Sequence, residues 1–412
     1  MAAVDTNLGS EPVIGPELTH AQVLRRTAEQ ASARGFEDVF IVDVDFHHLE
    51  DQSWTEILGY IDNDVVQHYF RAGGRGRWWM PGAMTVGGEQ EVQGRIQPFY
   101  SFMDGTPELQ GAPRDIARVR EAMDAMSCDY VTVFPTQLLD MGWNPHAHLE
   151  PHIARAWARW MVEQVLAQDP RILTLLYLPF GHPDECVALI EEFGDVPGVV
   201  GGMVTSVRYE PNFKREYMRL YAAMQERGLV LGFHGSLALG DRGFHQLNRF
   251  MAVHSISFPL YHMIQVANWI TNGLPELFPD LKLLFIEGGL AWVPFLMQRL
   301  DHEYLMRTSE APLLKRLPSE YMQEFFYSTQ PFEIADPQLA RITVEKIGPD
   351  QLLWASDWPH WDWDPPSKIW DLGYLTETQK RSVLGETARR VFGLPAGSGS
   401  ERDVRFARGE RS

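Results

Sequence analysis

Short apolar runs alternate along the chain with longer stretches in which apolar residues recur at helical spacing. The short runs indicate buried strands and the longer stretches indicate amphipathic helices. We predict eight strands, at residues 38–46, 129–135, 172–178, 198–206, 228–234, 281–287, 324–329 and 352–356. Helical patterns lie near residues 19–34, 149–168, 182–194, 213–227, 256–273, 289–308, 336–347 and 376–391. Because parallel strands need helical crossovers, this order predicts a (β/α)8 TIM barrel. A doubly wound open sheet is the alternative, but no GxGxxG motif follows the first strand.

The same pattern suggests how the chain is divided. Residues 1–36 are expected to form an N-terminal arm and a helix, and residues 37–394 the barrel. The first strand-to-helix connection is unusually long, at about 48–113, and an insertion of that size above a barrel commonly forms a lid or a pocket wall. Its aromatic residues could line a substrate pocket or only form the insertion's own small core. Residues 395–412 are expected to form a flexible tail.

Polar side chains stand at the C-terminal ends of four predicted strands, and in a barrel these ends converge on one face. Asp45 and His47 end the first strand and point to the same side, because they are two residues apart. His234 ends the fifth strand, Glu287 the sixth and Asp357 the eighth. Each alone has an ordinary interpretation, such as a solvated strand end, a turn residue or a helix cap. Together, two imidazoles and three carboxylates are costly as free charges and suit a divalent ion.

Four further residues are weaker candidates. His254 begins the segment leading into the sixth helix and could act in catalysis, or could form a hydrogen bond at the helix entry. Arg208, just beyond the fourth strand, could bind a substrate carboxylate through its planar guanidinium or form a surface salt bridge. Trp358 could form part of an aromatic wall at the substrate, or pack the last loop. His360 could orient Asp357 or be a loop residue.

Composition limits the possible partners. The chain has 412 residues and a formal net charge of −19, which disfavours nucleic acid and anionic membranes. No apolar run approaches membrane-spanning length, and residues 1–15 lack the apolar core of a signal peptide. The two cysteines, Cys128 and Cys186, form no spaced pattern and are interpreted as reduced packing residues. We therefore expect a cytoplasmic protein that acts on a small molecule.

Taken together, these motifs resemble those of the amidohydrolase superfamily, specifically the amidohydrolase-related branch that also holds the ACMSD-like decarboxylases. The resemblance runs from about Phe40 to about Leu394. It rests on Asp43-Val44-Asp45-Phe46-His47, Phe233-His234-Gly235, Phe278-Pro279-Asp280-Leu281-Lys282, Glu287-Gly288-Gly289, Trp292-Val293-Pro294, Arg299-Leu300-Asp301 and Ser356-Asp357-Trp358-Pro359-His360. It implies a distorted barrel with a metal site at its C-terminal rim, in which Asp45, His47 and His234 are ligands. Asp357 would be a ligand, the general base, or both. Members of the family often pair as homodimers.

Two positions depart from the family pattern. Many members carry His-x-His on the first strand, whereas Asp45 replaces the first histidine here. Decarboxylating members usually have a histidine at the strand-six position, where this chain has Glu287. A carboxylate there could bind a second ion and is less suited to act as a histidine acid near neutral pH. No lysine ends the fourth strand, so a carbamylated lysine that bridges two ions is not expected.

A site of imidazoles and carboxylates favours zinc, iron or manganese, with one or two ions per chain. Such an ion would lower the pKa of a bound water and polarise a carbonyl, while Asp357 accepts the water's proton. We therefore predict hydrolysis of an acyl bond in an amide, ester, lactone or thioester, and Glu287 favours this choice. The alternative is non-oxidative decarboxylation of an aromatic or enoic acid, and a third possibility is a barrel that only binds a ligand. The aromatic residues indicate a bulky apolar or aromatic substrate.

Overall fold

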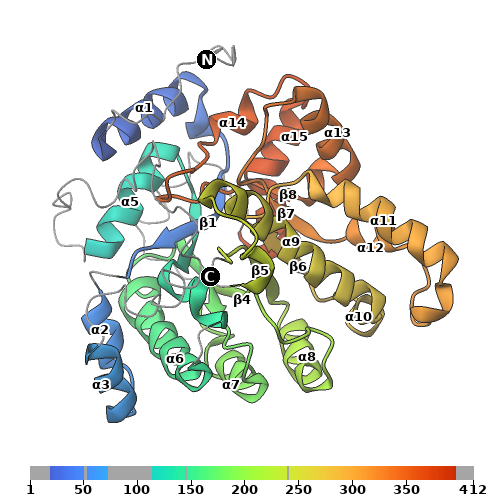
Figure 1. Ribbon diagram of the computed structural model, residues 1–412. Coiled ribbons are helices and arrows are strands. Elements are labelled where there is room, and N and C mark those ends of the chain that lie inside the picture. Colours follow the sequence, from blue (N-terminus) through green and yellow to red (C-terminus); the bar gives the residue numbers. More distant parts are fainter. Residues whose placement is uncertain (1–18, 51–52, 73–113, 144–145, 239–240, 396–412) are drawn as a thin grey trace.

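Eight parallel strands form the centre of the molecule. The computed structural model describes residues 19–50, 53–72, 114–143, 146–238 and 241–395. Within these residues, the strands are hydrogen-bonded in chain order from the first to the eighth. They are β1 (Val42–His48), β2 (Tyr130–Pro135), β3 (Ile172–Tyr177), β4 (Val199–Thr205), β5 (Val230–His234), β6 (Leu283–Ile286), β7 (Phe326–Ser328) and β8 (Leu352–Leu353). Figure 1 shows them at the centre with helices around them, which confirms the predicted (β/α)8 barrel.

Helices cover the outside of the strands (Figure 1). Those in the connections between strands are α2 (Trp54–Gly59), α3 (Asp64–Ala72), α5 (Arg114–Met126), α6 (Glu150–Trp160), α7 (Pro183–Phe193), α8 (Met218–Glu226), α9 (Phe250–Thr271), α10 (Leu274–Leu277), α11 (Trp292–Met306), α12 (Pro318–Met322) and α13 (Pro337–Ile347). After β8 come α14 (Ser367–Trp370), α15 (Glu377–Arg381) and α16 (Thr387–Phe392). Two stretches expected to be single helices each contain a π-helical turn, at Met161–Leu166 and Ser382–Glu386.

The first and last strands meet through the segment that follows β8, because β8 itself has only two residues. The backbone N–H of Asp357 donates to the carbonyl of Asp45 at 2.8 Å, and that of His47 donates to the carbonyl of Trp358 at 2.7 Å. An isolated parallel bridge joins Phe46 to Trp358 in the same place. These bonds close the barrel and set the two ends of the chain against each other.

Asp43 holds the two sides of this junction together. Its Oδ1 accepts hydrogen bonds from the backbone N–H groups of Ser356, at 2.9 Å, and Asp45, at 3.1 Å. The Ser356 hydroxyl donates to the other oxygen. Complete burial raises the pKa of Asp43 to about 7, although these hydrogen bonds act in the opposite direction. The residue therefore fixes β1 to the segment that carries Asp357.

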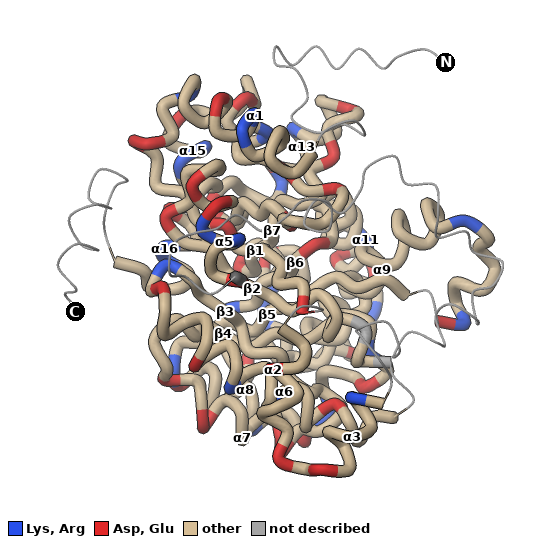
Figure 2. The backbone as a smooth tube through the Cα atoms, turned by 90° about the vertical axis from the view of Figure 1, so that its left-hand side faces the viewer, with Lys and Arg blue, Asp and Glu red and all other residues tan. Residues whose placement is uncertain are grey.

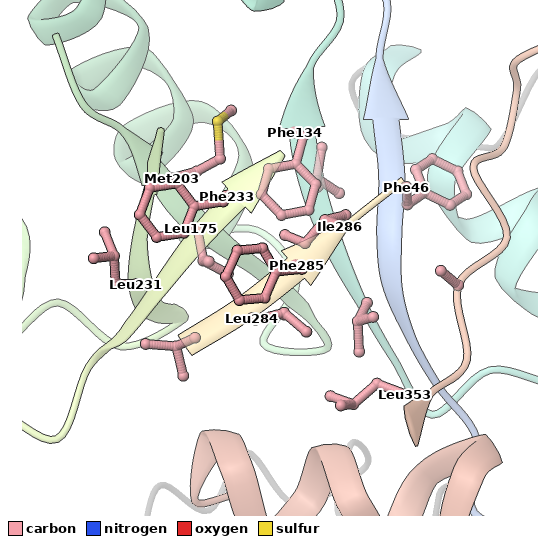
Figure 3. Packing of buried hydrophobic residues seen from close by; sticks show 14 of the residues in the cluster. Phe46, Phe134, Leu175, Met203, Leu231, Phe233, Leu284, Phe285, Ile286 and Leu353 are labelled. Carbon is pink, nitrogen blue, oxygen red and sulfur yellow. The ribbon is translucent and has the colours of Figure 1, made fainter. Parts of the chain in front are cut away.

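The interior of the barrel is filled by apolar side chains from non-adjacent strands. A Cβ atom added at Gly232 of β5 would lie 2.7 Å from Leu175 Cδ2 of β3 and 3.2 Å from Ile286 Cδ1 of β6. Glycine is therefore the residue that leaves room for these two side chains. Figure 3 shows Phe134, Leu175 and Ile286 between the strands. The ring of Phe134 lies 5.1 Å from that of His234, so apolar packing reaches the predicted site.

The segments outside the barrel are partly described. The helix expected near 19–34 is α1 (His20–Ala33), and Thr19 caps it in a capping box with Gln22. Of the expected insertion, α2 and α3 are described, whereas 73–113 lie outside the described residues, as do 1–18 and 396–412. The lid therefore stays a prediction.

Charged residues are spread over the chain rather than confined to one part of it. Figure 2 shows acidic and basic positions interspersed along the backbone. Among the described residues, no helix is both long and apolar enough to span a bilayer.

Candidate metal centre

The structure brings the predicted ligands together at the C-terminal rim of the barrel. Possible ligand atoms of Asp45, His47, His234 and Glu287 lie within 4.8 Å of one another. A second group of the same kind consists of His47, Asp357 and His360 and therefore shares His47 with the first. All six residues are buried. The strand-end rule thus identified side chains that meet in space, although they are far apart in sequence.

His47 lies between two carboxylates. Its Nε2 atom is 3.1 Å from Asp45 Oδ1 and 3.2 Å from Asp357 Oδ1. Neither approach has hydrogen-bond geometry, and both Nε2 of His47 and Oδ1 of Asp357 are buried without a hydrogen-bond partner. Ligands bound at right angles to one ion at about 2.1 Å would lie about 3 Å apart, which matches these separations. The donor set therefore fits a divalent metal ion.

The hydrogen bonding of His234 gives independent support. Its Nδ1 lies 2.7 Å from the carbonyl oxygen of Gly235, which can only accept, so Nδ1 carries the hydrogen. In the neutral ring Nε2 then has a lone pair, and this atom lies 3.2 Å from Asp45 Oδ1, which is also an acceptor. A cation between the two acceptors would resolve this arrangement. Metal-binding histidines usually donate their other N–H to a carbonyl or carboxylate in this way.

Glu287 lies on the other side of His234. Its Oε2 atom is 3.3 Å from Nδ1 of His234 and is buried without a hydrogen-bond partner. Its backbone N–H donates to the hydroxyl of Ser328 at 2.9 Å. The backbone φ of Glu287 is 59°, and that of Asp357 is also 59°. Non-glycine residues in this left-handed region carry a cost of order 1–3 kcal/mol and cluster at functional sites. The backbone thus turns sharply at both carboxylates.

The electrostatics of the cluster also favour a bound cation. Burial raises the pKa values of Glu287 and Asp357 well above their ordinary values, and repulsion from Asp45 and Asp362 adds to both shifts. Repulsion from Glu287 raises the pKa of Asp357 further. For Asp45, burial acts in the same direction, but the neighbouring imidazoles of His234 and His47 lower its pKa overall. Burial lowers the pKa of His47. Three buried carboxylates with two imidazoles are therefore stabilised best when a cation offsets the negative charge.

Asp357 is held by two residues besides the possible metal. The side-chain amide of Gln330 donates to Oδ2 at 3.0 Å. His360 places Nδ1 2.6 Å from Oδ1, and its ring stacks on that of His47 with centroids 4.0 Å apart. The predicted orienting role of His360 is compatible with these contacts. Gln330 was not predicted from the sequence, although it lies two residues beyond the end of β7 and a search of the strand ends could have identified it.

The remaining candidates lie elsewhere. Arg208 is buried, and its guanidinium is 2.7 Å from Glu150 Oε1 and donates to the hydroxyl of Tyr177 at 2.9 Å. Its predicted ion pair is therefore present, but inside the protein rather than at the surface. The ring of Trp358 packs on Trp363, with centroids 4.9 Å apart, and lies 5.3 Å from His20 of α1. A role of these residues in substrate binding stays a prediction.

His254 lies within α9, because this helix begins at Phe250 rather than at the expected residue 256. The reason is tertiary packing, since Val253 belongs to a second apolar cluster with Phe244 and Tyr261. Nε2 of His254 is 3.8 Å from Asp362 Oδ2, and Asp362 in turn raises the pKa values of Glu287 and Asp357. Asp362 thus lies between His254 and the two carboxylates Glu287 and Asp357. Asp362 was not predicted from the sequence.

The comparisons with known proteins agree with this geometry. A model of the amidohydrolase family matches residues 112–394, more than half of the chain. The γ-resorcylate decarboxylase of Polaromonas sp. JS666 is 23% identical over 251 residues, covering 58% of this chain and 76% of that protein.

Solved structures show the same fold. A dihydroxybenzoic acid decarboxylase from Polaromonas sp. JS666, with bound manganese and the inhibitor 2-nitroresorcinol, superposes with a TM-score of 0.62 at 16% identity and covers 87% of this chain and 98% of its own. The 5-carboxyvanillate decarboxylase of Sphingomonas paucimobilis gives a TM-score of 0.61 at 21% identity. The match covers 87% of this chain and 100% of the decarboxylase. With its eight-stranded barrel, its buried rim of imidazoles and carboxylates and this match, the chain belongs to the amidohydrolase family.

Proposed function

We propose that the protein is a metal-dependent, non-oxidative decarboxylase of an aromatic carboxylic acid. The observation that carries the proposal is the buried cluster of Asp45, His47, His234 and Asp357, in which Nε2 of His47 lies 3.1 Å from Asp45 Oδ1 and 3.2 Å from Asp357 Oδ1 without a hydrogen bond to either. Similar proteins named as resorcylate, dihydroxybenzoate and carboxyvanillate decarboxylases support the choice of reaction. This is the alternative of the sequence analysis, and it takes precedence over acyl-bond hydrolysis, which has support only at the level of the superfamily.

The four ligands named above would hold a divalent transition metal, and manganese is the ion bound in the Polaromonas neighbour. Such an ion supplies a positive charge that orients and polarises the oxygens of a bound acid and offsets the buried carboxylates. Asp357 is placed to carry a proton, because Gln330 donates to its Oδ2 and Nδ1 of His360 lies 2.6 Å from its Oδ1. In the reaction the bond between the ring carbon and the carboxylate breaks, carbon dioxide leaves, and a proton from Asp357 takes its place on the ring carbon. His360 would return a proton to Asp357 between turnovers.

The second candidate function is hydrolysis of an acyl bond. The observation that favours it is Glu287, a carboxylate at the strand-six position where decarboxylating relatives usually have a histidine. Its Oε2, 3.3 Å from His234, could position an attacking water or take part in binding a second ion. Glu287 thus favours hydrolysis whereas the similar proteins favour decarboxylation, and a direct assay has to separate the two reactions.

The test is an assay of both reactions with the manganese-loaded protein. Ortho-hydroxylated benzoic acids and substituted vanillates are supplied as acids, and aryl esters and lactones as hydrolysis substrates. We expect release of carbon dioxide from an acid, lost in the Asp357→Asn variant and after chelation of the metal. Hydrolysis of esters or lactones without release of carbon dioxide would instead favour the second function. Tight metal binding with neither reaction across both panels would contradict both and favour a barrel that only binds ligands.

A further inference from the structure

Helix α9 carries a histidine that lies next to the candidate metal centre without belonging to it. His262 has no exposed surface. Its Nε2 lies 2.8 Å from the carbonyl oxygen of Ile286, and its Nδ1 lies 2.8 Å from the hydroxyl of Ser206. Because a carbonyl only accepts, Nε2 carries the hydrogen, and Nδ1 accepts from the Ser206 hydroxyl. The ring is thereby fixed in one neutral tautomer.

Both partners of this ring are bonded to the residues around His234. The carbonyl of Ile286 also accepts from the backbone N–H of Gly235 at 2.8 Å, and the backbone N–H of Ser206 donates to the carbonyl of His234 at 2.7 Å. His262 thus joins the two backbone hydrogen bonds that hold the end of β5 on either side. Ile286 also directly precedes Glu287, so the same contact fixes the point at which the chain turns to φ 59°.

Neighbouring residues make this arrangement rigid. Gln265, on the same helix, donates from its side-chain amide to the carbonyl of Ser206 at 2.9 Å. The side chain of Asn212 in turn donates to Gln265 Oε1 at 3.0 Å. A Cβ atom at Gly288 would lie only 2.2 Å from His262 Cδ2, so the imidazole packs directly on the backbone that follows Glu287. Chains of buried hydrogen bonds of this kind rigidify the structure around them.

The burial of a polar ring at this position calls for an explanation, because an apolar side chain would avoid the cost of desolvating an imidazole. Burial lowers the pKa of His262 to about 3, so the ring stays neutral at physiological pH. The charge state of the ring therefore does not change under working conditions, and its role must lie in the two directed hydrogen bonds.

We propose that His262 is a positioning residue that, through Ile286 and Ser206, fixes the ends of β5 and β6 and thereby the places of His234 and Glu287. The inference rests on the proposed metal centre but not on which reaction the centre catalyses. The outer contacts of metal ligands typically change metal affinity by about 10–100-fold when they are removed.

Three variants test this role. In His262→Phe the ring stays and both hydrogen bonds are lost, whereas the amide in His262→Gln can still donate to Ile286 and accept from Ser206. Ser206→Ala removes only the donor to Nδ1 and serves if His262→Phe fails to fold. Trp269→Phe is the matched control, because Trp269 is a buried residue of α9 outside this network.

Two readouts separate positioning from general stability. One is the visible spectrum of bound Co²⁺ together with the Mn²⁺ affinity, which report the geometry of the ligands. The other is hydrogen exchange of the metal-free protein, measured in peptides covering 203–208 and 232–237, with a peptide covering β3 as reference. We expect His262→Phe to change the spectrum, to weaken Mn²⁺ binding by about 10–100-fold and to speed exchange only in those two peptides. We expect His262→Gln to restore both readouts and Trp269→Phe to lower the melting temperature without changing the spectrum.

An unchanged spectrum and affinity in a folded His262→Phe variant, or faster exchange spread evenly over all strands, would overturn the inference and leave His262 as a packing residue. Absence of metal binding in the unsubstituted protein would contradict the proposed metal centre, and the exchange data would still decide whether His262 fixes the strand ends. A protein that binds metal normally but shows neither reaction would contradict only the proposed function.

Discussion

Replacing Arg208 alone should destabilise the protein strongly, whereas replacing it together with Glu150 should cost much less. The guanidinium of Arg208 lies 2.7 Å from Glu150 Oε1, and both side chains are buried. The hydroxyl of Tyr177 donates to the same carboxylate oxygen at 2.6 Å and accepts from Arg208 at 2.9 Å. Burial opposes the charge on Arg208, but Glu150 more than compensates and raises the pKa of Arg208 above its ordinary value. The three groups therefore form one closed buried unit.

The magnitude follows from the charge that each variant leaves behind. Arg208→Met leaves the Glu150 carboxylate buried with Tyr177 as its remaining donor within this unit, and breaking such a pair costs about 3–5 kcal/mol. Glu150→Gln leaves a buried guanidinium and should cost a similar amount. The double variant removes both charges while the glutamine can still accept from Tyr177, and replacing a buried pair in this way is often close to neutral. We expect each single variant to lose more stability than the double variant, and two losses of about 3–5 kcal/mol against a nearly neutral double variant correspond to a coupling of about 6–10 kcal/mol.

The assay is urea unfolding of the four proteins, followed by tryptophan fluorescence and circular dichroism at fixed metal concentration. Losses in the single variants that simply add up in the double variant would refute the interaction. The same proteins test the predicted role of Arg208 in substrate binding, because the double variant should keep its kcat/KM if the pair is structural. A fall in kcat/KM in a stably folded double variant would instead show that Arg208 contacts the substrate.

Three further predictions concern the site and its surroundings. Asp357→Asn should leave the fold intact and lower kcat by about 10²–10⁴-fold, as measured by product formation under saturating substrate; near-normal turnover would exclude it as the proton carrier. His234→Ala should weaken metal binding by more than about 100-fold, since even outer contacts account for up to that factor; full occupancy by elemental mass spectrometry after dialysis would exclude it as a ligand. Burial raises the pKa of Asp115, but the interaction with His48 outweighs it and lowers the pKa to about 2. The ionised carboxylate therefore stabilises the folded protein by about 2 kcal/mol above pH 4, and this stabilisation is lost as the pH falls towards 2. Asp115→Asn should therefore be less stable at neutral pH, and the difference in unfolding free energy from the unsubstituted protein should shrink below pH 4; a constant difference would contradict the assignment.

The candidate ligands could be predicted from the sequence because they obey a local rule. In a parallel barrel the last residues of each strand lie on one rim, so reading the end of each apolar run is enough to find Asp45, His47, His234 and Asp357. The rule also applies to Gln330, which lies just beyond the short strand β7. It was not predicted because the search considered ionisable groups, and a glutamine amide is not one of them. The reaction was harder to predict, because Glu287 alone favoured hydrolysis whereas the known proteins that resemble the chain are decarboxylases.

Other features depend on contacts that no local pattern contains. His262 lies in a largely apolar helix, and its partners Ser206 and Ile286 are 56 and 24 positions away. Glu150 was expected only as part of a helix, and its pairing with Arg208 arises from the way α6 packs against the strands. A side chain of this kind can be recognised as polar and buried from sequence, but its partner is set by the tertiary fold.

The junction between β1 and the end of β8 has a consequence for synthesis on the ribosome. Asp43 and Ser356 are 313 positions apart, and Asp45 and Asp357 are brought together by the same junction. Closing a loop of that length costs about 5 kcal/mol in chain entropy beyond a constant. A nascent chain whose residue 357 is still inside the ribosome has only part of the proposed ligand set, so it should hold a metal ion weakly. Metal capture is therefore expected late in biogenesis, and tight binding of the ion reports that the first and last strands have met.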